Sequence, residues 1–162
     1  MDKRADDSEL VQRAVHGDTE AYGTLYELHL DAIYRYVFYR AGNVHDAEDL
    51  TETVFLRGWQ AIGSYVVNGV PFRAWLYRIA HNCVVDHYRG RRPAEPLALY
   101  ANLEDERPHL DDRVAVNEQM RRLVAAVRQL SPQHQHVLIL RFVEGLSHDE
   151  VAGVLKRRVG AV

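Results

Sequence analysis

Apolar residues recur three and four positions apart along most of this chain, and no stretch shows the strict alternation that marks a half-buried strand. The segment 71–90 is a clear example, because Phe72, Leu76, Ile79 and Cys83 fall on one stripe of a helix. With this spacing, the apolar residues gather on one face of a helix, whereas in a strand they would be divided between both faces. We therefore predict an all-α fold.

Residues that favour helix ends divide the first part of the chain into four helices. We expect these helices over residues 7–16, 18–41, 45–62 and 71–90. Asp18 is suited to cap the second helix, Gly42 to end it, and Pro71 to stand in the first turn of the fourth. The segment GSYVVNGVP, residues 63–71, should be a loop because glycine and proline interrupt the helical pattern there.

The helical period fades between residues 93 and 111, where prolines and acidic residues predominate. This composition is typical of a linker rather than of a packed element. We place a domain boundary there. Residues 1–92 are expected to form one small helical domain and residues 112–162 a second one.

The second part carries signals for two closely spaced helices. Ser131 and Pro132 provide a cap and a first-turn residue, and Gly145 ends the helix that they begin. Ser147 and Glu150 then form a capping box at the start of HDEVAGVL. Two helices joined by a short glycine turn are either the first half of a helix-turn-helix or an ordinary helical hairpin, and spacing alone leaves both open.

Charge is segregated along the chain, although the formal net charge is only -3. Residues 71–92 hold five arginines against one acid, and residues 119–162 hold seven bases against three acids. Between these basic segments, residues 93–118 hold seven acids against two bases. Two basic regions separated by an acidic one predict contact with nucleic acid at two places.

Several other functions lack their sequence signals. The group His81, Cys83 and His87 has no second Cys/His pair at zinc-site spacing, so we predict no metal and no other cofactor. There is no phosphate-binding glycine loop and no nucleophile elbow, so we expect neither an enzyme nor a small-molecule substrate. No apolar run could span a membrane and the start is polar, which leads us to expect a cytoplasmic protein without membrane insertion.

Three strings carry a family resemblance: DAEDLTETVFLRGW, FRAWLYRIAHNCVVDHYRGRR and LSPQHQHVLILRFVEGLSHDEVAGVL. They resemble regions 2.2, 2.3 to 2.4 and 4 of bacterial extracytoplasmic-function (ECF) sigma factors of the sigma-70 family, in the family's order and spacing. The resemblance implies a non-catalytic subunit that binds core RNA polymerase, directs it to promoter DNA and helps to open that DNA. The implied partners also include an anti-sigma factor.

The resemblance places the polymerase contact on the third helix. It implies a docking face for the clamp helices of the beta-prime subunit, with the beta flap as a further contact of the polymerase. The residues assigned to that face are Asp46, Asp49, Glu52, Thr53 and Leu56. The family usually has Gln-Glu where this chain has Glu52-Thr53, so we expect core affinity to be altered. From composition alone, these acids would be read as solvated surface.

The resemblance also assigns residues to DNA. The loop 63–71 would capture a flipped base of the -10 element, Asn82 would line the adjacent site, and arginines would hold the backbone. The assigned residues are Tyr65, Asn68, Gly69, Arg73, Arg78, Asn82, Arg89, Arg91 and Arg92. A solvated basic helix end is the alternative for the arginines. We expect Asp86 to pair with a nearby arginine inside the protein.

The chain stops where the family continues with a basic recognition helix that reads the -35 element. We therefore expect the second region to be incomplete at its end, with Lys156, Arg157 and Arg158 on the -35 side. This ending keeps a second function open. A sigma-like protein could bind core polymerase or an anti-sigma factor without productive -35 recognition.

Overall fold

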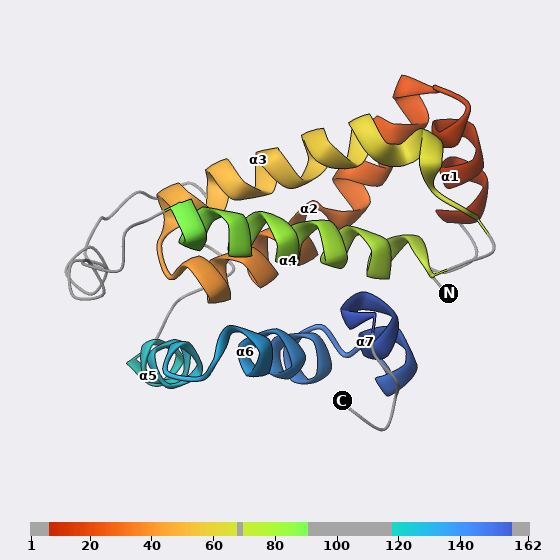
Figure 1. The fold of residues 1–162 in the computed structure, drawn as a ribbon. Coiled ribbons are helices and arrows are strands. Elements are labelled where there is room, and N and C mark those ends of the chain that lie inside the picture. Colours follow the sequence, from red (N-terminus) through yellow and green to blue (C-terminus); the bar gives the residue numbers. More distant parts are fainter. Residues whose placement is uncertain (1–6, 68–69, 91–117, 157–162) are drawn as a thin grey trace.

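The computed structural model describes residues 7–67, 70–90 and 118–156, and every regular element in these ranges is a helix (Figure 1). The predicted all-α fold is confirmed. The first part contains α1 Asp7–Val15, α2 Thr19–Ala41, α3 Val44–Ala61, the short 3₁₀ turn η1 Ile62–Ser64 and α4 Phe72–Gly90. The second part contains α5 Glu118–Arg128, α6 Pro132–Leu138, the π-helical turn η3 Ile139–Val143 and α7 His148–Leu155.

The predicted caps are present. The Asp18 carboxylate accepts hydrogen bonds from the backbone of Glu20 and Ala21 at the start of α2, and Gly42 ends that helix with a φ of 77°. Ser147 and Glu150 form the reciprocal capping box of α7. Local chemistry therefore sets these helix ends, as the sequence predicted.

The two parts of the chain share one apolar core. Helices α2, α3 and α4 pack lengthwise with α1 across one end, and α5, α6 and α7 lie in a row along the α4 side (Figure 1). The core cluster runs through both parts without a break, since Ile139, Leu140 and Val154 join Leu25, Val37 and Leu76. The described residues of the second basic segment, 119–162, therefore pack against the basic helix α4.

The π-helical turn is a feature that the sequence pattern did not reveal. We expected one regular helix from Pro132 to Gly145, but η3 widens its last turn. Phe142 is 81% exposed there, whereas Ile139 and Leu140 are buried. The next residue after η3, Glu144, is directed at α2 and α4.

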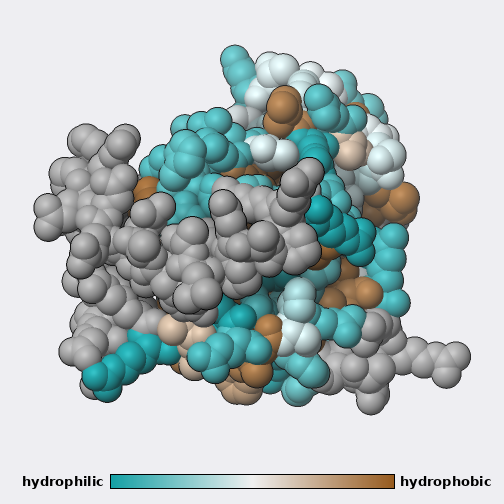
Figure 2. Space-filling view, turned by 60° about the vertical axis from the view of Figure 1, so that its left-hand side comes forward, coloured by the Kyte–Doolittle hydropathy of each residue, from teal (hydrophilic) through white to brown (hydrophobic). Residues whose placement is uncertain are grey.

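Apolar groups on the visible face of the molecule form small, separate patches among hydrophilic residues (Figure 2). No helix within the described ranges combines the length and apolarity that a membrane span requires.

Gly58 provides a test of the packing between α2 and α3. A Cβ at this position would lie 2.5 Å from the Tyr22 hydroxyl oxygen, which donates a 2.6 Å hydrogen bond to the Phe55 carbonyl. We predict that Gly58→Ala lowers the free energy of unfolding by about 1–3 kcal/mol, because the hydroxyl must leave its buried acceptor. Urea denaturation measures this change.

The matched control is Gly23→Ala in α2, where an added Cβ meets nothing within 4 Å. That change should leave stability equal or raise it by about 0.5–1 kcal/mol through the higher helix propensity of alanine. Equal effects of the two substitutions would contradict the proposed steric cause.

Candidate nucleic-acid and polymerase interfaces

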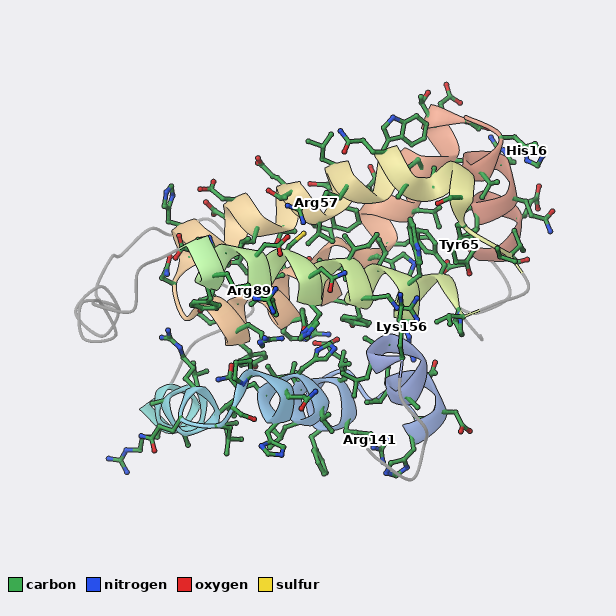
Figure 3. The ribbon with its side chains drawn as sticks, viewed as in Figure 1. His16, Arg57, Tyr65, Arg89, Arg141 and Lys156 are labelled. Carbon is green, nitrogen blue, oxygen red and sulfur yellow. The ribbon has the colours of Figure 1, made fainter. Side chains whose placement is uncertain are left out.

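The polar side of α4 is the strongest candidate for a nucleic-acid contact. Arg78, Asn82 and Arg89 follow one another at spacings of four and seven, so they share one face of the helix. Asn82 and Arg89 are exposed. Tyr65 and Arg89 lie near opposite ends of α4 (Figure 3). A strand of nucleic acid running along this helix would meet both.

The loop before α4 is anchored by aromatic packing. The Tyr65 ring lies 5.2 Å from the Trp75 ring and 5.9 Å from the Phe72 ring, measured between centroids. Its hydroxyl donates to the Val70 carbonyl at 2.7 Å, which closes the loop on itself. The predicted DNA contacts Asn68, Gly69, Arg91, Arg92, Arg157 and Arg158 lie outside the described residues.

Helix α7 covers the first half of this interface. Arg73 pairs with Glu150 at 3.0 Å, and the Arg78 guanidinium donates to the carbonyls of Gly153 and Val154 at the end of α7. Both carbonyls stand in the last turn of α7, at the negative end of the helix dipole, so a cation suits them; the Gly153 carbonyl also accepts the backbone N–H of Lys156. Two predicted DNA-binding arginines are therefore occupied inside the protein. Their assignment to DNA stays a prediction.

A buried carboxylate joins the second part of the chain to the first. The Glu144 side chain is only 2% exposed, and it accepts hydrogen bonds from Arg35 at 2.8 and 2.7 Å and from the Tyr77 hydroxyl at 2.8 Å. Burial, and next the Glu144 charge, raise the pKa of Tyr77. These contacts cross 109 and 67 positions of sequence, so pattern reasoning missed them.

Two histidines stack between the two parts with their ring centroids 4.0 Å apart. The Tyr36 hydroxyl accepts from Arg40 and bonds to Nδ1 of His136, and Arg40 also lies 3.1 Å from Nδ1 of His81. Both Nδ1 atoms face donors, so both rings are neutral. Burial, and next the charge of Arg40, lower the pKa of His81 to about 4. Burial, and next the proximity of His81 and Arg40, lower the pKa of His136 to about 2.

The outer face of α3 presents most of the predicted polymerase contacts. Asp49 and Glu52 are exposed, Leu56 is 59% exposed, and the Thr53 hydroxyl donates to the Asp49 carbonyl at 2.9 Å. Asp46 differs, since it is 7% exposed, accepts from the Asn43 amide and lies 3.5 Å from His87. Its carboxylate is therefore turned inward at the start of α3. The polymerase assignment of all five residues stays a prediction.

Two further sequence expectations can be compared with the structure. Asp86 pairs with Arg57 at 2.9 Å, so its predicted role as an intramolecular partner is confirmed. Within the part of the chain that the structure describes, no three His, Cys, Asp or Glu side chains gather as metal ligands would.

Comparison with protein families assigns both parts of the chain. Residues 25–93 match the model for Sigma-70 region 2, and residues 120–162 match the model for Sigma-70, region 4. The chain is 30% identical to the RNA polymerase sigma-H factor of Pseudomonas aeruginosa, over 96% of this chain and 86% of that protein. The chain belongs to the sigma-70 family, in its ECF group. The family resemblance predicted from the sequence is confirmed.

Two further relatives extend this result. The ECF sigma factor BldN of Streptomyces coelicolor is 40% identical over 95% of this chain, which spans 59% of the length of BldN. The structure of CnrH in complex with the cytosolic domain of CnrY is 26% identical, with a TM-score of 0.72, covering 96% of this chain and 86% of CnrH. CnrH itself comes from Cupriavidus metallidurans.

The neutral histidines predict that acid separates the two parts of this sigma-family chain. Each histidine has a lowered pKa only while it is buried between the two parts. Below pH 6.5, the ordinary pKa of histidine, protons therefore favour an open arrangement, in which the two parts have separated and both rings are exposed. The packing free energy should fall by about 1.4 kcal/mol per histidine for each pH unit below 6.5. The fall should end near pH 4 for His81.

The distance between spin labels at Glu27 and Gln129, in a chain with Cys83 replaced by serine, measures this opening between pH 7.5 and 5. His136→Gln should flatten the pH dependence, because the side chain no longer titrates. His134→Gln changes an exposed histidine on the same helix and should leave the dependence intact. An identical response from both variants would refute the assignment.

Proposed function

We propose that this chain is a sigma factor that binds core RNA polymerase in the cytoplasm, directs it to promoters and begins DNA melting. The observation that carries the proposal is the arginine-bearing side of α4 beside the loop 63–71, in a chain that matches regions 2 and 4 in order. The protein acts as a non-catalytic subunit. The polymerase performs the chemistry.

At the -10 element, the loop 63–71 would hold an extruded base, and α4 would read a base edge and bind phosphates. An extruded base needs a pocket beside positive charge, and the loop anchored by Tyr65 stands next to the start of α4. Asn82 offers amide donors and acceptors that read a base edge, while Arg78 and Arg89 neutralise phosphates. Arg78 must first leave the end of α7.

The polymerase is bound through the outer face of α3. Leu56 supplies exposed apolar area, and Asp49 and Glu52 supply negative charge on the same face. A basic helical surface such as the beta-prime clamp helices would complement both. Where the family usually has Gln-Glu, this chain has Glu52-Thr53, so the negative charge sits one position earlier on α3 and core affinity should be altered.

The packing of α7 on α4 makes the described arrangement a closed one. DNA cannot reach Arg73 and Arg78 while Glu150 and the α7 carbonyls occupy them. Binding to polymerase and promoter therefore requires the second part to move away. An anti-sigma partner, of the kind that CnrY represents for CnrH, would hold the closed arrangement.

Asn82→Ala tests the base-reading role. The exposed side chain is not needed for packing, so core binding should stay within about twofold of the original. Promoter opening should fall by about tenfold or more, since one good base contact contributes about 1–3 kcal/mol. Transcription with core enzyme, and permanganate reactivity of the promoter, measure the two steps.

Failure of the unchanged chain to support any promoter opening, despite binding core enzyme, would refute the sigma-factor proposal. It would favour a protein that only occupies polymerase or an anti-sigma factor. Equal loss of core binding and opening in Asn82→Ala would instead trace the defect to misfolding.

Glu144→Ala tests the closed arrangement. It removes the carboxylate that holds Arg35 and Tyr77, so the two parts should separate more readily. Separation of the two parts costs free energy before core enzyme can bind, and the substitution lowers that cost. The apparent affinity for core enzyme should therefore rise by about tenfold. Fluorescence titration with labelled core enzyme measures this, and Glu27→Ala, which removes an exposed acid from α2, is the control. Unchanged affinity would contradict a closed state that limits binding.

A further inference from the structure

Arg40 is a buried cation whose hydrogen-bond partners are uncharged. Its residue is 2% exposed, and its Nη1 donates to the Tyr36 hydroxyl at 2.7 Å and lies 3.1 Å from Nδ1 of His81. Its Nε has no hydrogen-bond partner. None of the ion pairs formed within the described ranges includes Arg40. A buried guanidinium without an anion is costly, so a counter-charge is expected beside it.

A cavity of about 620 Å³ opens next to this arginine, between the ends of α2 and α4 and the helices α5 and α6. Arg40, Arg89 and Arg128 line it together with His81, and no acidic residue is among the described residues of its wall. Figure 3 places Arg89 at this end of α4, on the side toward α5 and α6. The volume suits a ligand of nucleotide size.

We propose that this cavity binds a small phosphorylated molecule, with its phosphate held by Arg40, Arg89 and Arg128. Guanidinium groups pair with phosphate oxygens through two parallel hydrogen bonds, and three of them on one cavity match a multiply charged anion. Tyr88 lines the same cavity, and Val85 and Pro132 give it an apolar wall for the rest of the molecule.

The ligand would bridge the two parts of the chain. Arg40 and Arg89 belong to the first part, whereas Arg128 and Gln133 belong to the second. The complete cavity exists only in the closed arrangement, so the ligand stabilises that arrangement over the open one. It would thereby hold back DNA binding, a consequence that rests on the proposed sigma-factor function.

Calorimetric titration of the full chain with inorganic pyrophosphate and with ADP, at matched ionic strength, tests the site. We expect saturable binding of one ligand per chain, weakened about tenfold or more by Arg128→Ala and by Arg89→Ser. Arg57→Ser is the matched control, because Arg57 pairs with Asp86 and does not line the cavity. Tighter binding of ADP than of pyrophosphate identifies a nucleotide, and equal binding identifies a free phosphate anion.

Absence of saturable binding overturns the proposal, as does unchanged affinity in both cavity variants. Binding that appears only after Glu104, Asp105 and Glu106 become amides would identify the chain's own carboxylates as the occupant, and would also overturn it. Circular dichroism checks that each variant folds, and Arg89, being exposed, can be changed without disturbing the core. The titration involves neither polymerase nor promoter, so its result is separate from that of the transcription assay.

Discussion

The arrangement of the two halves depends on the buried carboxylate of Glu144. A desolvated charge is tolerated only when it is paired and hydrogen-bonded, and here Arg35 and Tyr77 together supply three hydrogen bonds from two helices. This contact attaches the end of the π-helical turn to α2 and α4. With that turn in place, α7 lies against the start of α4, and the α7 carbonyls reach Arg78.

The same arginines serve two exclusive partners. In the closed chain, Arg73 neutralises Glu150 and Arg78 completes the end of α7. DNA phosphates could bind these guanidinium groups only after the groups have left Glu150 and the α7 carbonyls. Since the intramolecular and the DNA contacts compete for the same donors, the strength of the packing between the halves sets how readily the DNA face becomes available.

In the middle of the contact between the two parts, a buried cation has uncharged partners, whereas Glu144 and Glu150 are each paired with an arginine. Arg40 donates toward Tyr36 and His81, and the tyrosine in turn bonds His136, so one cation holds two imidazoles in their neutral form. These hydrogen bonds require both imidazoles to be neutral, which holds at high pH but not at low pH. The buried guanidinium also needs an anion close to it. The contact is therefore sensitive to its solution conditions in a way that apolar packing alone would not be.

Apolar spacing and capping residues determined the helices of this protein. Asp18, Gly42 and the Ser147–Glu150 box act within a few residues of themselves, so their effects are readable along the chain. That Asp86 pairs with an arginine was also foreseeable, because Asp86 is the only acid in a segment of five arginines, but its partner Arg57 lies outside that segment, on α3. Family motifs, which are likewise local strings, identified the two sigma regions. Only the tertiary structure decided that Glu144 is buried and that α7 occupies the arginines of α4, because those contacts join residues 67 to 109 positions apart and depend on how whole helices pack.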